Sequence, residues 1–212
     1  MGKIKQGILG GFSGKVANVV GSSWKGIAVM KSLPLSVANP KTTKQILQRN
    51  RFSLLVSFAS DLLSSIVKPL WDRFAQKMSG FNDFVSNNFD AFFEGQAAVD
   101  YEKIVISKGK MVAPTISAIT ETEPGIISVT FTSDESDPYA LDSDQVYLAA
   151  IDITSKKAFP LSDGDFTRDD SPISIDLPAN LDTSHDHYVY MAFKRIDGTI
   201  VSDSGYYLWA SE

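Results

Sequence analysis

The sequence predicts an α+β protein, in which an N-terminal β-hairpin and a helical domain precede an all-β sandwich. Three observations predict this order: a glycine-dense, β-prone start, apolar residues at helical spacing in the middle, and short alternating segments separated by turn residues in the second half. A chain of 212 residues can form two domains, each with its own core. We place them at residues 1–105 and 113–212, with the boundary inside Asp100–Val112, a strand with a glycine turn.

The first element is a ribbon rich in glycine. Half of the fourteen glycines precede Ile27, which either frees the backbone or lets it approach another surface closely. Lys15–Val20 and Ile27–Leu33 are β-prone, and Gly21–Ser23 is the expected turn between them. A lone hairpin is marginal in water, so this two-stranded ribbon must pack on its own helices or on a partner.

The helical part follows Asn39-Pro40, which breaks the extended chain. Thr42-x-x-Gln45 matches a capping box, and apolar residues then recur at helical spacing up to Pro69, where the helix should end or kink. Further helices are expected over Leu70–Met78 and from Gly80 onward. The many phenylalanines between Phe81 and Phe93 favour a compact helical core over a ligand pocket.

Seven strands are expected after Ala113. This number in about 100 residues is typical of an immunoglobulin-like or fibronectin type III-like sandwich. Asp197-Gly198 is a hairpin signal between the last two strands, and Tyr188 is the candidate for a corner tyrosine. The expected strands are Thr115–Ile119, Ile126–Thr132, Gln145–Ile153, Lys157–Leu161, Ile173–Leu177, Tyr188–Arg195 and Thr199–Leu208.

Charge is divided unevenly along the chain. Nine Lys and Arg residues and no Asp or Glu occur up to Ser60, and eleven basic and 25 acidic residues follow. A positive part beside a negative one can bind a polyanion such as nucleic acid, or can pair head to tail with another copy of the chain. The predicted partner-binding residues, for assembly or for a polyanion, are Lys15, Trp24, Lys25, Lys31, Lys41, Lys44, Arg49 and Arg51.

Composition excludes several kinds of site. Without cysteine, neither a disulfide nor a thiolate zinc site can form. No apolar run resembles a signal peptide or spans a membrane, so we expect cytoplasmic synthesis, with the virion as a further location.

Two groups of side chains are candidates for a metal site. His185 and His187, if both face one way with Asp182 and Asp186 beside them, could hold a metal, although a surface pair at the start of a strand is the commoner arrangement. Calcium could bind the acidic loops around Asp134–Asp144 and Asp163–Asp170, but solvated turns explain them more simply. No catalytic residue, metal or cofactor is therefore predicted, and the chain is expected not to be an enzyme.

The N-terminal sequence also resembles a known set of proteins. The stretch MGKIKQGILGGFSGKVANVVGSSWKG, the Met30–Pro34 exit and the Asn39-Pro40-Lys41-Thr42-Thr43 elbow are similar to a family of unknown function from Bacteroidota genomes and their phages. The resemblance extends to Asp197-Gly198 and Tyr206-Tyr207. A similar hairpin and elbow occur in phage-encoded proteins of assumed virion or tail role, which implies assembly.

Together these features predict a non-enzymatic structural or attachment protein. We expect a phage or prophage-type virion component that docks through its N-terminal half and forms a homo-oligomer or binds protein partners. One alternative is a nucleic-acid-binding protein that uses the same basic arm. The other is a carbohydrate-binding or cell-surface-binding sandwich with an aromatic platform of Tyr139, Tyr206, Tyr207 and Trp209.

Overall fold

The chain forms two compact units, Met1–Thr42 and Thr43–Glu212. The structure, a computed structural model, describes residues 3–4, 12–24, 27–34, 36, 39–92, 99–134 and 136–211. Antiparallel sheets occur in both units and helices in the second, so the protein is α+β. The division at residue 42 differs from the boundary expected between residues 105 and 113, because the helices share a core with the sheet that follows them.

Unit 1 contains an antiparallel N-terminal sheet in the order β1-β2-β3-β4. The predicted two-stranded ribbon was wrong in detail, because the tight turn lies at Ala17-Asn18 and Gly21–Ser23 is inside a strand. Gly21 is required there since a Cβ atom would stand 2.2 Å from the carbonyl oxygen of Phe12 and 2.7 Å from its ring. The strands are β1 (Lys3–Ile4), β2 (Phe12–Val16), β3 (Val19–Trp24) and β4 (Ile27–Ser32).

Unit 2 begins with the helices. α1 (Thr43–Asp61) starts directly after the predicted cap residue, and a bend of 70° separates it from the helical stretch Leu63–Trp71. The bend therefore comes several residues before Pro69. The remaining pieces are the π-helix η2 (Leu63–Val67), α2 (Lys68–Trp71), α3 (Gly80–Asn88) and the 3₁₀ turns η3 (Phe89–Ala91), η4 (Tyr101–Lys103) and η5 (Arg168–Asp170).

A helix that spans a membrane must be long and apolar. No single helix in the described part of the chain has both the length and the apolar character to cross a membrane. The bent pair Thr43–Asp61 and Leu63–Trp71 is long and apolar enough only when its two helices are counted together.

Each of the seven predicted strand segments overlaps an observed strand. One antiparallel sheet has the order β11-β10-β7-β8 and the other has the order β5-β6-β9. The turn at Asp197-Gly198 is present, with Gly198 at φ +67° and Lys194 paired to Val201. The strands are β5 (Thr115–Glu123), β6 (Ile126–Thr132), β7 (Gln145–Asp152), β8 (Ala158–Thr167), β9 (Ile173–Asp176), β10 (His187–Lys194) and β11 (Gly205–Trp209).

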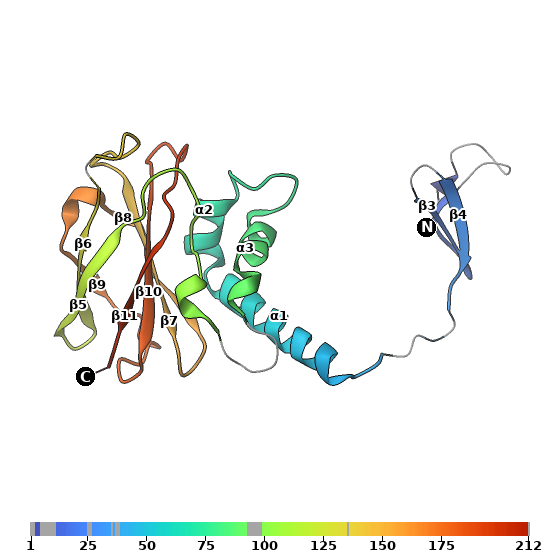
Figure 1. Ribbon diagram of the computed structural model, residues 1–212, viewed down its shortest axis with the longest axis horizontal. Coiled ribbons are helices and arrows are strands. Elements are labelled where there is room, and N and C mark those ends of the chain that lie inside the picture. The colour runs from blue at the N-terminus through green and yellow to red at the C-terminus, as the bar shows by residue number, and fades with distance from the viewer. Residues whose placement is uncertain are drawn as a thin grey trace. The chain divides into compact units, whose positions relative to one another are not determined.

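Unit 2 has three layers: the β5-β6-β9 sheet, the four-stranded sheet and the helices (Figure 1). The four-stranded sheet is consequently buried on both faces at its centre. In β7, Val146 and Leu148 face the core between the sheets, whereas Tyr147 and Ala149 face the helices. Ala149 on β7 and Ala192 on β10, which lies opposite Tyr147, are small, so the helices can approach this face closely.

The segment expected to be a strand and a boundary, Asp100–Val112, instead lies along the sheet and fastens the helices to it. It contains η4 and otherwise irregular backbone. The Trp71 Nε1 atom donates to the Ile106 carbonyl at 2.7 Å, and the Ser107 hydroxyl donates to the Ser202 carbonyl at 2.7 Å. A Cβ atom on Gly109 would stand 1.8 Å from the Val201 carbonyl oxygen, so this stretch is closely packed.

Candidate partner interface

The structure brings two of the predicted site lysines together on the N-terminal sheet. Lys15 pairs with Val20 on β3, and Val20 pairs with Lys31 on β4. Directly opposed residues of antiparallel strands project from the same face, so the two lysines flank Val20 at a separation of about 10 Å. Both lysines are exposed. We call Lys15, Val20 and Lys31 the cationic row.

Apolar side chains of the same sheet are also uncovered. Met30 is 68% exposed, Ile27 60% and Val16 50%. Among the described residues of unit 1, no apolar side chain reaches the burial of a core residue. Every residue of β4 is exposed, although strands of this kind normally bury at least one face. Among its described residues, the N-terminal sheet therefore presents apolar and cationic surface with no buried apolar side chain.

The other predicted site residues are distributed over both units. Lys41 is exposed in unit 1, while Lys25 and the side chain of Trp24 lie outside the described residues. Lys44 and Arg49 are exposed on the first half of α1, which belongs to unit 2. Arg49 also lines a hollow of about 510 Å³ with Gln48, Phe52, Ser53 and Val56.

Arg51 does not belong to this exposed set, which corrects the prediction. Its guanidinium lies 3.9 Å from the centre of the Phe89 ring and donates a hydrogen bond to the Phe89 carbonyl. One nitrogen is 3.8 Å from the Asp90 carboxylate, and the side chain is only 11% exposed. Arg51 therefore holds α1 against η3 and is not available to a partner.

The two histidines do not face one way. His187 is fully buried with its ring 5.4 Å from that of Trp209, and burial lowers its pKa. His185 turns toward Asp152, with Nδ1 2.8 Å from a carboxylate oxygen. The hydrogen bond that His185 donates to the Asp152 carboxylate raises the pKa of His185, and Asp182 lies 3.8 Å from its other ring nitrogen.

Asp152 is the centre of this cluster. Burial alone would raise its pKa, but hydrogen bonds from Ser155, His185 and the backbone N–H of Thr154 lower it to about 2. The Ser155 hydroxyl donates to Asp152, so it is not arranged as a nucleophile next to a histidine base. The cluster joins the β7–β8 turn to the loop before β10 and stabilises both.

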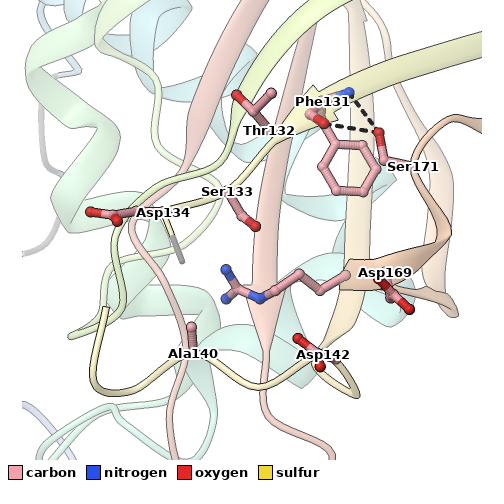
Figure 2. Close-up of a pocket in the computed structure, with 9 residues that line it drawn as sticks. Phe131, Thr132, Ser133, Asp134, Ala140, Asp142, Asp169 and Ser171 are labelled. Carbon is pink, nitrogen blue, oxygen red and sulfur yellow. Dashed lines mark hydrogen bonds between the residues drawn. The ribbon is translucent and has the colours of Figure 1, made fainter. Parts of the chain in front are cut away.

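Acidic loops lie at one end of the two-sheet part. Asp134, Asp142 and Asp169 line a cavity of about 540 Å³ together with Arg168. Figure 2 shows Asp134 on one side of it and Asp142 and Asp169 on the other. Arg168 is buried, with one nitrogen 3.1 Å from the buried Asp144 carboxylate.

Calcium binding was the alternative to solvated turns for these acidic loops. Within the ranges that the structure describes, no group of three or more His, Asp or Glu side chains could hold a metal ion. Several of the carboxylates instead accept hydrogen bonds from their own loops. Asp137 accepts from the backbone N–H groups of Val112 and Tyr139, and Asp134 accepts from Ser136.

Aromatic side chains near the C-terminus lie on different faces. Tyr206 lies beside Tyr188, whose ring stacks on Tyr101 at 5.2 Å on the helix side of the sheet. Tyr207 and Trp209 pack against the core between the two sheets. The aromatic platform expected for carbohydrate binding is thus not assembled on one surface. Tyr188, the candidate for a corner tyrosine, instead packs toward the helices.

The fold and this surface define an α+β protein with a cationic row on its N-terminal sheet and a helix-backed pair of sheets. The chain belongs to a family of unknown function, DUF6266, whose model matches residues 11–208. The match covers β2 through nearly all of β11, so both units are part of the family's architecture. No curated protein and no solved structure matches the chain.

Proposed function

We propose that this protein is a non-enzymatic structural or attachment protein that docks into an assembly through its N-terminal sheet. The uncovered sheet carries the proposal, because strands without a core are at best marginally stable in water. Complete burial of side chains such as Ile27 and Met30 against a partner contributes about 1.5–3 kcal/mol each. A partner surface thus supplies the burial that unit 1 lacks.

The proposed assembly is a phage or prophage-type virion. Support comes from the resemblance of the N-terminal hairpin and Asn39-Pro40 elbow to phage-encoded proteins. In this proposal unit 1 is the attachment part and unit 2 the part that is displayed.

For the paired sheets of unit 2 we propose a fibronectin type III-like or immunoglobulin-like sandwich. The supporting observation is the strand order, since seven strands divide into β5-β6-β9 and β11-β10-β7-β8 with a shared core. Sandwiches of this kind serve as displayed modules on many cell surfaces. The helices on the outer face of the larger sheet are an addition to that plan.

A second candidate function is nucleic-acid binding by the cationic row. Two lysines on one face, in a stretch without carboxylates, can contact phosphates. The distinguishing property is salt dependence, because the logarithm of DNA affinity falls with the logarithm of salt concentration by about 0.9 per phosphate contact. Absence of duplex or single-strand binding at low salt would remove this candidate.

The proposed function is tested by comparing the full chain with Thr43–Glu212 in the cells that produce the protein. The full chain should sediment with high-mass particles, whereas the truncated chain should stay in the supernatant and unfold at the same temperature as unit 2 of the full chain. As a matched control, a full chain with Lys108→Ala, changed in unit 2, should still sediment. Equal sedimentation of the truncated chain would contradict the proposal.

A further inference from the structure

We infer that the cationic row of one copy docks on the acidic end of unit 2 of a second copy. The inference rests on the proposed function, since it names the partner of the N-terminal sheet. We define the acidic end by the exposed carboxylates around the cavity of Figure 2 and on the adjoining strand β8. They are Asp134, Asp142, Asp163, Asp165, Asp169 and Asp170.

The N-terminal sheet has a strongly one-sided charge. No Asp or Glu occurs before Asp61, so the cationic row has no carboxylate of its own unit as a neighbour. Val20 and Val29 lie on the same face of the sheet as the two lysines. Val29 pairs with Ser22, and Ser22 shares a face with Val20 because the two are two residues apart on β3. This face therefore suits a surface that offers carboxylates around an apolar or hollow centre.

The acidic end offers such a surface. The register places Asp163 beside Tyr147 and Thr167 beside Gln145, so β8 brings its carboxylates to the same end as the loop before β7. Asp134 and Asp170 are ionised at neutral pH, and hydrogen bonds from Ser136 and Thr167 lower their pKa values further below the ordinary range. The cavity between the loops has room for a side chain from a partner.

Nearby cations do not neutralise this end. Arg168 is already paired with the buried Asp144, and its guanidinium lies 3.9 Å from the centre of the Phe193 ring. The Lys194 ammonium donates to the Tyr147 hydroxyl at 3.4 Å, and Arg195 donates to the Tyr139 carbonyl at 2.6 Å. Hydrogen bonds to neutral acceptors leave Lys194 and Arg195 charged, but these two cations are outnumbered by the six exposed carboxylates, so the field at this end stays net negative and attracts a cationic partner.

A second copy is the occupant that the charges favour. From Asp61 onward the chain carries 25 acidic and eleven basic residues, so each copy has one cationic surface and one complementary acidic surface. Such a contact is heterologous: it closes as a reciprocal pair or a ring, or it continues as a filament. The self-association should weaken with salt, because its charges are at the surface.

The test uses charge reversal in the full chain, with light scattering and sedimentation equilibrium at low and high salt. Lys15→Glu with Lys31→Glu should raise the dissociation constant of self-association about tenfold or more. Asp142→Lys with Asp169→Lys should do the same. The matched control is Glu123→Lys with Asp176→Lys, which reverses two carboxylates flanking Ile126 at the opposite end of the β5-β6-β9 sheet.

Combining the two reversed sets should restore association to near the level of the unchanged chain. Loss of association with the control pair, or no restoration in the combined variant, would overturn the inference, and so would a strict monomer at both salts. These results leave the proposed function intact if the full chain still sediments with particles and Thr43–Glu212 does not. If both chains sediment alike, the proposed function fails independently.

Discussion

At the residue scale, the contact between His185 and Asp152 is the clearest local determinant of stability. Asp152 is buried and accepts hydrogen bonds from His185, Ser155 and Thr154. Because its pKa falls to about 2, its contribution is present above its ordinary pKa and is lost as the pH falls toward 2. The cluster therefore ties two turns together over the pH range of most cells.

His185 makes the opposite contribution. Its pKa in the folded state is raised above the ordinary 6.5, so its stabilising effect is fully present below pH 6.5 and disappears as the pH rises through the raised value. We expect His185→Asn to lower the free energy of unfolding most at pH 5.5 and least at pH 8.5. Urea unfolding of both proteins at several pH values measures this difference.

The buried His187 also contributes to the pH dependence of stability, both in the unchanged protein and in His185→Asn. Its lowered pKa makes the fold less stable on acidification in both proteins, and burial, the largest cause, is common to both. The smaller effects of His185 on this pKa oppose each other, since its backbone hydrogen bond raises the pKa and its charge lowers it. Asp182→Asn serves as a graded comparison: the charge of Asp182 also raises the pKa of His185, but Asp182 lies farther from the ring than Asp152 does, so a smaller difference of the same sign is expected. A difference that stays constant with pH would show that His185 is not protonated more readily in the folded state.

At the element scale, the position of β11 depends on close backbone packing. A Cβ atom on Gly205 would stand 2.0 Å from the carbonyl oxygen of Pro114, in the segment that leads into β5. Because that neighbour is backbone, it cannot rotate away as a side chain would. The start of β11 is thus fitted to the start of β5, on the other sheet.

We expect Gly205→Ala to destabilise the protein by about 1–3 kcal/mol, because the strand must shift to admit the methyl group. Gly125→Asn is the matched control: Gly125 has no atom within 4 Å of a Cβ position, and Asn tolerates its φ of +86°. The control should cost at most a few tenths of a kcal/mol. Thermal unfolding compares the two, and similar losses would contradict the packing argument.

At the scale of the whole molecule, the helices and the four-stranded sheet form one folding unit. Their common core contains Phe58, Leu62 and Trp71 from the helices, and Ile151 and Tyr190 from the sheet. The Tyr190 hydroxyl also donates to the Tyr101 carbonyl at 2.7 Å. The sheet therefore depends on the helices for one of its two buried faces.

This dependence predicts how fragments behave. Thr43–Glu212 should unfold cooperatively, whereas residues 113–212 alone should be much less stable and should bind a hydrophobic dye, because they expose the face around Tyr147, Ile151 and Tyr190. Circular dichroism and dye fluorescence measure both properties. If the shorter fragment unfolds at the same temperature as Thr43–Glu212, the shared core is not needed.

Part of this protein could be predicted from its sequence because it depends on near neighbours along the chain. The positions of the strands follow from short β-prone segments and turn residues such as Asp197-Gly198. The start of α1 follows Pro40 and Thr42. The charge division at Asp61 is a property of the sequence alone, and it directed attention to Lys15 and Lys31.

The sequence does contain evidence that the four-stranded sheet is buried on both faces, although the prediction of the strands was not based on it. The runs Val146–Ile151 and Tyr188–Phe193 are continuously apolar, as in strands covered on both sides, rather than alternating as in a free-standing sandwich. These two runs therefore indicate that another layer covers the sheet. A domain boundary at residues 105–113 would divide the core that this layer and the sheet share.

The sequence by itself determined the α+β class, the seven strand segments after Ala113, the start of α1 and the opposite charges of the two parts of the chain. The strands before Ile27 and the end of the helix expected over Leu70–Met78 were not determined in this way, since Gly21–Ser23 is inside β3 and α2 ends at Trp71. Only the tertiary structure decided which of these residues meet. Arg51 is held by Phe89, 38 residues away, and His185 by Asp152, 33 residues away. The physical reason is that propensity and charge are local properties, whereas burial and hydrogen-bond partners arise when distant segments pack against each other.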